Sequence, residues 1–200
     1  MIILNSNAQN IYWVGRYLSR IQYLCGQFPF QTDDEAVQYA HAFCLPAFNA
    51  SSLNELTLNP EQPASFHQQF QSVKHNIQDL RGVLSIKAYC ELKQMINTAN
   101  EHAGYICSVV DECSEVLEAE NEDIFLFFSL GQLFENLDRQ IRLSQDFTQT
   151  IQSLNGLIEM LKLKGWDSLD EAWQHLLAHP NSNSFYQLND QVQYLFEVGA

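Results

Sequence analysis

The chain has 200 residues, 46% of them hydrophobic, so it is long and apolar enough to bury a core and does not have the composition of a disordered segment. Its formal net charge of −14 repels nucleic-acid phosphates and anionic membrane surfaces, which argues against both as partners. No stretch approaches the roughly 18 consecutive apolar residues of a membrane span, and the first residues lack the basic start and long apolar run of a signal peptide. We therefore expect a single domain over residues 1–200, located in the cytoplasm.

Apolar residues recur every three or four positions through most of the chain, which is the period of an α-helix, and no alternating strand pattern competes with it. None of the five prolines lies within residues 64–179, where we expect long helices. Segment 45–60 is expected to be an irregular connector. The pattern predicts an all-α helical bundle with two long central hairpins. The predicted helices cover residues 8–26, 33–44, 61–83, 85–118, 122–149, 151–164, 168–179 and 184–197.

One helical pattern occurs twice, at an offset of 116 positions. Residues 10–25 read NIYWVGRYLSRIQYLC, and residues 126–141 read LFFSLGQLFENLDRQI. Under this offset Gly15 corresponds to Gly131, and the apolar positions on both sides of the glycine also correspond. A glycine costs an exposed helix interior about 1 kcal/mol relative to alanine, so its presence at the same place in both copies indicates close helix–helix approach. We predict that the two segments pack against each other, glycine to glycine.

The polar sides of the two copies carry charges at helical spacing, namely Arg16 and Arg20 in the first and Glu135, Asp138, Arg139 and Arg142 in the second. In the second copy each acid precedes an arginine by four residues, the order that favours ion pairs along a helix surface. The alternative is that the two arginines of the first copy meet Glu135 or Asp138 between the helices, because buried arginines need carboxylate partners. Such a cluster would be either structural or a ligand-binding or catalytic site.

The five cysteines are odd in number and contain no Cys-x-x-Cys motif. This pattern supports neither a disulfide framework nor a zinc cluster. We expect the cysteines to be small buried apolar residues in a reducing compartment.

Two further groups of polar residues are weaker candidates for a site. His175 and His179 share a helical face with Glu171, but the histidine pair lacks the glutamate of an HExxH zinc motif, so an exposed polar stripe is favoured over a metal site. Segment 111–123 holds seven acids, which we expect to form a solvated acidic corner. No phosphate-binding loop, dinucleotide fingerprint or nucleophile elbow is present, and we predict no cofactor.

Three short blocks of the chain carry a resemblance to a known family. Residues 8–20 read AQNIYWVGRYLSR, residues 76–85 read NIQDLRGVLS, and residues 130–139 read LGQLFENLDR. They resemble the blocks A-E-N-L-Y-W-x-G-R-Y-x-E-R-A-E, N-A-R-x-x-R-x-x-I-S and L-G-R-x-L-E-R-A-D-R of the bacterial alpha-E domain family. The resemblance lies within about residues 4–145 and leaves residues 150–200 as a helical extension. Gln9, Ser19 and Gln22 replace the acids of the first block, whereas Arg16, Arg20, Arg81, Glu135, Asp138 and Arg139 are kept.

The resemblance implies a role beside ATP-grasp-type peptide or amide ligases in pathways that make small peptides. Our leading hypothesis is an accessory, non-catalytic helical protein that binds such a ligase or its peptide product. The first alternative is an enzyme acting on a peptide or amide, with Glu135 or Asp138 as acid/base and Arg16, Arg20, Arg81 or Arg139 binding a carboxylate or phosphate. The second alternative is a homo-oligomeric scaffold that uses carboxyl-terminal aromatic residues, namely Trp166, Trp173, Tyr186 and Tyr194.

Overall fold

The computed structural model describes residues 3–99 and 103–198, which form ten α-helices, two 3-10 turns and no strand. This confirms the predicted all-α bundle. The helices are α1 (Asn5–Gln27), α2 (Asp33–Ala42), α3 (Ala50–Leu58), α4 (Phe66–Asp79), α5 (Ile86–Ala99), α6 (Ala103–Glu118), α7 (Glu122–Arg142), α8 (Thr148–Leu163), α9 (Asp170–Ala178) and α10 (Ser182–Val198), and the turns are η1 (Leu80–Gly82) and η2 (Asp167–Leu169). None of the described helices has both the length and the apolar content that crossing a membrane requires.

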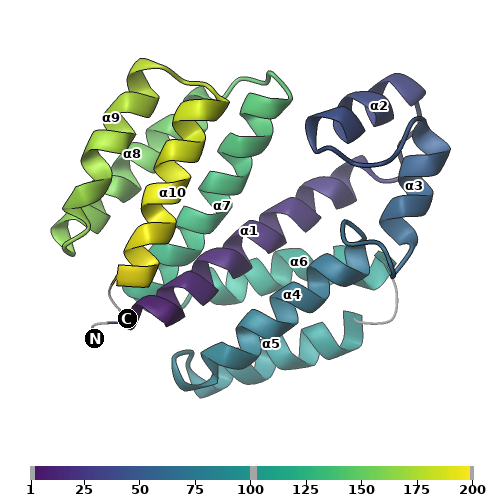
Figure 1. Ribbon diagram of the computed structural model, residues 1–200. Coiled ribbons are helices and arrows are strands. Elements are labelled where there is room, and N and C mark those ends of the chain that lie inside the picture. The colour runs from purple at the N-terminus through teal and green to yellow at the C-terminus, as the bar shows by residue number, and fades with distance from the viewer. Residues whose placement is uncertain (1–2, 100–102, 199–200) are drawn as a thin grey trace.

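The two helices that carry the duplicated pattern, α1 and α7, pack side by side at the centre of the molecule (Figure 1). Helices α8, α9 and α10 lie on one side of this pair, α4, α5 and α6 lie on the other, and α2 and α3 lie near the carboxyl end of α1 (Figure 1). The first turn of α1 meets the last turns of α10, where Asn5 Nδ2 donates to the carbonyl oxygen of Leu195 at 2.7 Å.

The contact between α1 and α7 is a backbone-to-backbone crossing made possible by the two glycines. A Cβ atom added to Gly15 would overlap the carbonyl oxygen of Phe128, and one added to Gly131 would overlap the carbonyl oxygen of Tyr12. Both glycines are therefore required by close approach, which confirms the predicted packing of the two copies. We call this contact between α1 and α7 the seam.

Two predicted elements were wrong in their organisation, and the predicted helices 61–83 and 122–149 were too long, since α4 is Phe66–Asp79 and α7 ends at Arg142. The expected connector 45–60 contains α3, whose first turn is closed by a reciprocal capping box between Asn49 and Ser52. The expected single helix 85–118 is instead two helices, α5 and α6, that pack on each other. A single helix of that length would leave the apolar faces of both halves uncovered, whereas folding back buries residues such as Leu92 and Val110.

The carboxyl-terminal aromatic residues divide into two groups. Trp173 is fully buried, and Trp166 packs its ring on Phe127 and Phe196 with centroid distances of 5.1 and 5.3 Å. Tyr186 and Tyr194 are exposed at 42% and 56%. The tryptophans therefore complete the core, and the two tyrosines are the members of this group that reach the surface.

Candidate functional site

Five charged side chains meet at the seam: Arg16 and Arg20 from α1, and Glu135, Asp138 and Arg142 from α7. We call them the arginine–carboxylate cluster. They lie within about three turns of the glycine crossing on each helix, so the close backbone approach brings their long side chains within bonding distance. The cluster confirms the prediction that Arg16 and Arg20 meet acids across the helix pair.

Glu135 is the centre of the cluster and is only 3% exposed. Its Oε1 accepts a hydrogen bond from Arg20 Nε at 2.6 Å, and its Oε2 accepts from Arg20 Nη2 and from Arg16 Nε, both at 2.9 Å. Burial alone would raise the pKa of Glu135, but the positive charges and N–H donors of Arg20 and Arg16 outweigh it and hold the pKa below its ordinary value. Glu135 is therefore an ionised carboxylate with both oxygens occupied.

Arg16 uses all three of its nitrogens within the core. In addition to Glu135, its Nη1 donates to the Tyr12 hydroxyl at 3.2 Å and to Asn189 Oδ1 at 3.0 Å, and its Nη2 lies 3.5 Å from Asp138 Oδ2. The Tyr12 hydroxyl in turn donates to Asn189 Oδ1 at 3.1 Å, and burial raises the pKa of Tyr12 to about 12. Tyr12 is therefore a neutral donor that fixes Asn189 of α10 onto the seam.

Asp138 and Arg142 form the outer half of the cluster. Arg142 Nε donates to Asp138 Oδ1 at 2.7 Å, which confirms the ion pair predicted along the helix. Arg142 also donates to the carbonyl oxygen of Ala42 at 2.9 Å and to the Tyr186 hydroxyl. This arginine therefore connects α7 to the end of α2 and to α10.

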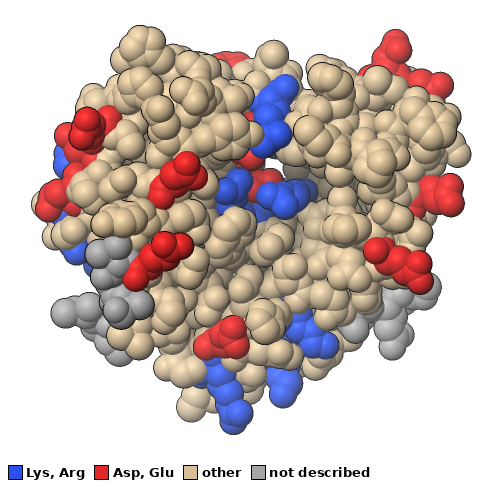
Figure 2. Space-filling view, in the orientation of Figure 1, with Lys and Arg blue, Asp and Glu red and all other residues tan. Residues whose placement is uncertain are grey.

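A cleft of about 390 Å³ opens beside the cluster. Arg20, Asp138 and Arg142 line it from the cluster, and Tyr39 of α2 and Gln69 of α4 also contribute to its lining. Figure 2 shows Lys/Arg and Asp/Glu atoms together in a hollow at the centre of this face, where tan residues otherwise dominate. The cluster contains three guanidinium groups and two carboxylates, which leaves one net positive charge at the cleft.

Two arginines predicted as ligand-binding candidates lie outside the cluster. The spacing predicted that Arg139 pairs with Glu135, and this was wrong. The guanidinium of Arg139 instead lies 4.0 Å from the ring centroid of Tyr23 and donates hydrogen bonds to Gln145 and Asn136. Arg81 is exposed in η1 and has no bond to the cluster within the described residues. Glu135 prefers the arginines of α1 because its side chain points into the seam, where they are the nearest donors.

The weaker candidates lie at the surface. Glu171, His175 and His179 are exposed, as predicted for a polar stripe, and the two histidine rings lie 5.3 Å apart. Within residues 3–99 and 103–198, no group of three or more His, Cys, Asp and Glu side chains is arranged to hold a metal ion. The acids of segment 111–123 lie on the end of α6 and the start of α7, where most of them are exposed, which confirms the acidic corner.

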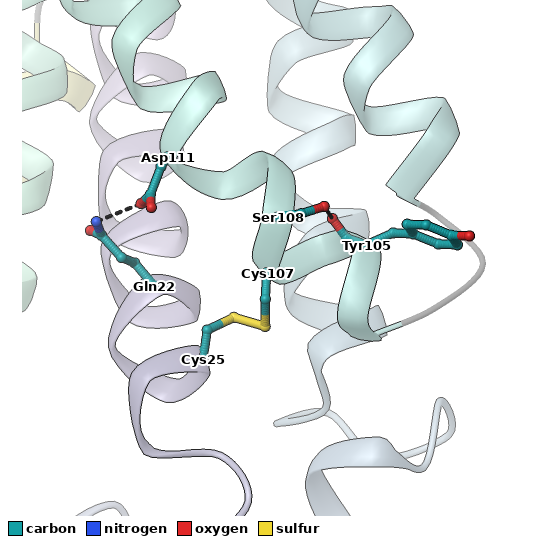
Figure 3. The surroundings of a disulfide bond; sticks show 6 residues. All are labelled: Gln22, Cys25, Tyr105, Cys107, Ser108 and Asp111. Atoms are coloured by element: carbon teal, nitrogen blue, oxygen red, sulfur yellow. Dashed lines mark hydrogen bonds between the residues drawn. A yellow bond between two sulfur atoms is a disulfide. The ribbon is translucent and has the colours of Figure 1, made fainter.

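The cysteine prediction was wrong in two ways. Cys25 of α1 and Cys107 of α6 form a disulfide, beside a hydrogen bond from Gln22 Nε2 to Asp111 Oδ1 at 2.7 Å (Figure 3). Of the three free cysteines Cys113 is buried, whereas Cys44 and Cys90 are exposed. The two bonded cysteines are 82 residues apart, so no local spacing reveals the pair; the packing of α1 on α6 creates it.

Two polar residues of this site were missed by the sequence analysis. Asn189 lies on α10, far along the chain from Arg16, and nothing in its spacing distinguishes it from the many other amides of the chain. Gln69 is 6% exposed; its Nε2 donates to the carbonyl oxygen of Ala64 at 2.7 Å, and its Oε1 has no hydrogen-bond partner among the described residues. One signal in the sequence could have identified Gln69. It is a polar residue on the apolar face of α4, beside Phe66 and Phe70.

The arrangement can hold charge but is poorly suited to proton transfer. A general acid or base must exchange a proton with a substrate within its reach, whereas Glu135 is held ionised by three hydrogen bonds from two arginines and does not line the cleft. Comparison with protein-family models, with curated proteins and with solved structures finds no match to this chain. Membership of the alpha-E domain family therefore stays a prediction that rests on the three sequence blocks.

Proposed function

We propose that this chain is an accessory, non-catalytic helical protein that binds a partner, and that the partner is a peptide or amide ligase of the ATP-grasp type. The observation that carries the non-catalytic assignment is that Arg16 and Arg20 hold the buried Glu135 with three hydrogen bonds, away from the lining of the cleft. The kind of partner comes from the resemblance to the alpha-E domain family. The alternative of an enzyme acting on a peptide or amide is less favoured, because Arg81 and Arg139 lie away from the carboxylates with which they were expected to act.

A second feature supports a binding role and offers a docking surface. A groove of about 920 Å³ runs between α5 and α6, and we call it the hairpin groove. Its apolar lining includes Met95, Val109 and Val116, and Glu91, Glu112, Glu115, Glu120 and Lys87 supply its charges. Four acids against one lysine leave a strongly negative rim around an apolar floor, so the complementary occupant is a basic amphipathic helix of the partner.

The homo-oligomeric scaffold is the second alternative, and the burial of Trp166 and Trp173 leaves it less apolar surface than the sequence suggested.

The compartment is also part of the proposal. A ligase that consumes ATP favours the cytoplasm, whereas the Cys25–Cys107 disulfide favours an oxidising compartment. Alkylation of thiols in intact cells, followed by mass spectrometry of Cys25 and Cys107, decides between the two.

Co-purification tests the docking proposal. The tagged chain is co-expressed with the ATP-grasp-type ligase encoded in its own gene neighbourhood, and recovery of the ligase is measured. The double variant Glu112→Lys with Glu115→Lys should weaken recovery about tenfold or more, because it reverses the charge of the groove rim. The matched control is Glu55→Lys with Glu61→Lys, two exposed acids away from the groove. The proposal fails if the wild-type chain recovers no ligase, or if the groove variant recovers as much as the control.

A further inference from the structure

We infer that the cleft beside the arginine–carboxylate cluster binds an N-acylated amino acid or the carboxyl terminus of a short peptide, with the carboxylate on Arg20 and the amide N–H on Gln69. The juxtaposition that carries this inference is a guanidinium with a free edge and a buried, unpartnered amide oxygen on two residues that line the same cleft. The hairpin groove uses none of the same residues, so the cleft and the docking surface can succeed or fail independently.

Arg20 is the anion-binding group of the cleft. Its Nε and Nη2 are bonded to Glu135, whereas its Nη1 makes no hydrogen bond within the described part of the chain. The side chain is 33% exposed, compared with 7% for Arg16, so its free edge is accessible from the cleft. Since Glu135 fixes the guanidinium plane and the cluster keeps one net positive charge, a carboxylate can add here without displacing an existing ion pair.

Gln69 supplies the second recognition element. The bond from its Nε2 to the carbonyl oxygen of Ala64 fixes which end of the amide is which, so the unpartnered atom is the acceptor Oε1. A buried acceptor without a partner destabilises a protein by about 1–3 kcal/mol, which makes it unusual unless something else supplies the donor. A ligand N–H is such a donor. A ligand that carries only a carboxylate would leave this atom unpaired.

The remaining walls define the side chain that the ligand carries. Tyr39 and Phe43 pack their rings with centroids 4.7 Å apart on one side of the cleft, and Tyr17, Leu24 and Leu45 line it elsewhere. These side chains favour an apolar group over a polar one. The volume of about 390 Å³ is near the lower end of the range of about 300–1,000 Å³ for small-molecule sites, so the bound part is the size of one or two amino acids.

Calorimetric titration with three related probes tests the assignment. N-acetyl-leucine has the carboxylate, the amide N–H and an apolar side chain; N-acetyl-leucinamide lacks the carboxylate charge; 4-methylpentanoate lacks the amide. N-acetyl-leucine should bind the wild-type chain about tenfold or more tightly than either analogue, since a hydrogen bond to a charged group is typically worth about 1.5–3 kcal/mol. Equal binding of the acid and its amide, or no binding of N-acetyl-leucine, overturns the inference.

Two variants separate recognition from folding. Gln69→Leu should remove the preference for N-acetyl-leucine over 4-methylpentanoate while leaving the preference over N-acetyl-leucinamide, a pattern that general destabilisation does not produce. Ser72→Trp places a large side chain in the cleft from α4 without replacing a residue of the cluster and should abolish binding of all three probes. Ser153→Trp, at an exposed position of α8, is the matched control and should bind as wild type. Wild-type binding by Ser72→Trp also overturns the inference.

Discussion

The seam and the hairpin groove both present carboxylates, and their surroundings give these carboxylates opposite roles. At the seam, Glu135 is almost fully buried and each of its oxygens is bonded to arginine. In the groove, Glu112 and Glu115 are exposed and no arginine lines the groove with them. The same functional group is therefore structural where a guanidinium is buried with it, and is available to a partner where it is exposed to solvent.

The disulfide connects these two regions of the molecule. Cys25 lies on the seam helix α1, and Cys107 lies on the groove helix α6. The helix that carries the exposed acids, α6, is therefore covalently bonded to α1, which carries the arginines of the buried cluster.

Removing the central carboxylate should have the largest effect. Glu135→Leu leaves Arg16 and Arg20 without their main partner, and removing one member of a buried ion pair typically destabilises a protein by about 3–5 kcal/mol. Urea unfolding followed by circular dichroism measures the loss. The matched control, Glu115→Leu in the groove, should leave the free energy of unfolding nearly unchanged. Similar losses in the two variants would contradict the contrast between seam and groove.

Breaking the disulfide should have the second-largest effect. The double variant Cys25→Ser with Cys107→Ser frees two helices that are 82 residues apart, and the loss of such a cross-link typically costs about 2–4 kcal/mol of unfolding free energy. Thermal unfolding without reductant measures it. Cys90→Ser, which changes an exposed free cysteine, is the control and should behave as wild type. If the double variant is as stable as this control, the disulfide does not contribute to the free energy of unfolding beyond what helix packing supplies.

Adding a methyl group at the glycine crossing should be next. Gly131→Ala places a Cβ atom against the carbonyl oxygen of Tyr12, which forces the helices apart at a cost of about 1–3 kcal/mol. Gly156→Ala on α8 meets open space and should stabilise the protein by up to about 1 kcal/mol. Chemical denaturation of both variants gives the comparison. The predicted crossing is contradicted if the two substitutions shift stability in the same direction.

Acidification should produce the smallest of these effects. Because the pKa of Glu135 is lower in the folded than in the unfolded protein, its contribution is fully present above the unfolded value of about 4.3 and is lost as the pH falls through the folded value. One proton taken up on unfolding corresponds to a slope of up to about 1.4 kcal/mol per pH unit. The free energy of unfolding of the wild type, measured from pH 5 downward, should fall more steeply than that of Glu135→Gln. Parallel curves would show that Glu135 has an ordinary pKa.

The sequence by itself determined the helical class, the central helix pair and most of the cluster. The 3.6-residue period gave α1 nearly in full and covered all of α7, although the predicted helix continued seven residues beyond Arg142. The paired glycines predicted the crossing because glycine is unfavourable in a helix unless close approach requires it. The need of buried arginines for acids then predicted the contact of Arg16 and Arg20 with Glu135. All three signals are local patterns whose physical meaning does not depend on the rest of the fold.

Only the tertiary structure decided which distant residues complete these patterns. Three such contacts are the Cys25–Cys107 bond, the hydrogen bond between Arg16 and Asn189, and the position of Gln69 at the cleft. Each brings together segments that are far apart in the sequence, and no periodic pattern relates those segments. The division of segment 85–118 into α5 and α6 has the same origin, since helical propensity continues along the segment whereas burial of its apolar face requires it to fold back. Local propensity determines which secondary structure a segment can form, and tertiary packing determines which other segments it contacts.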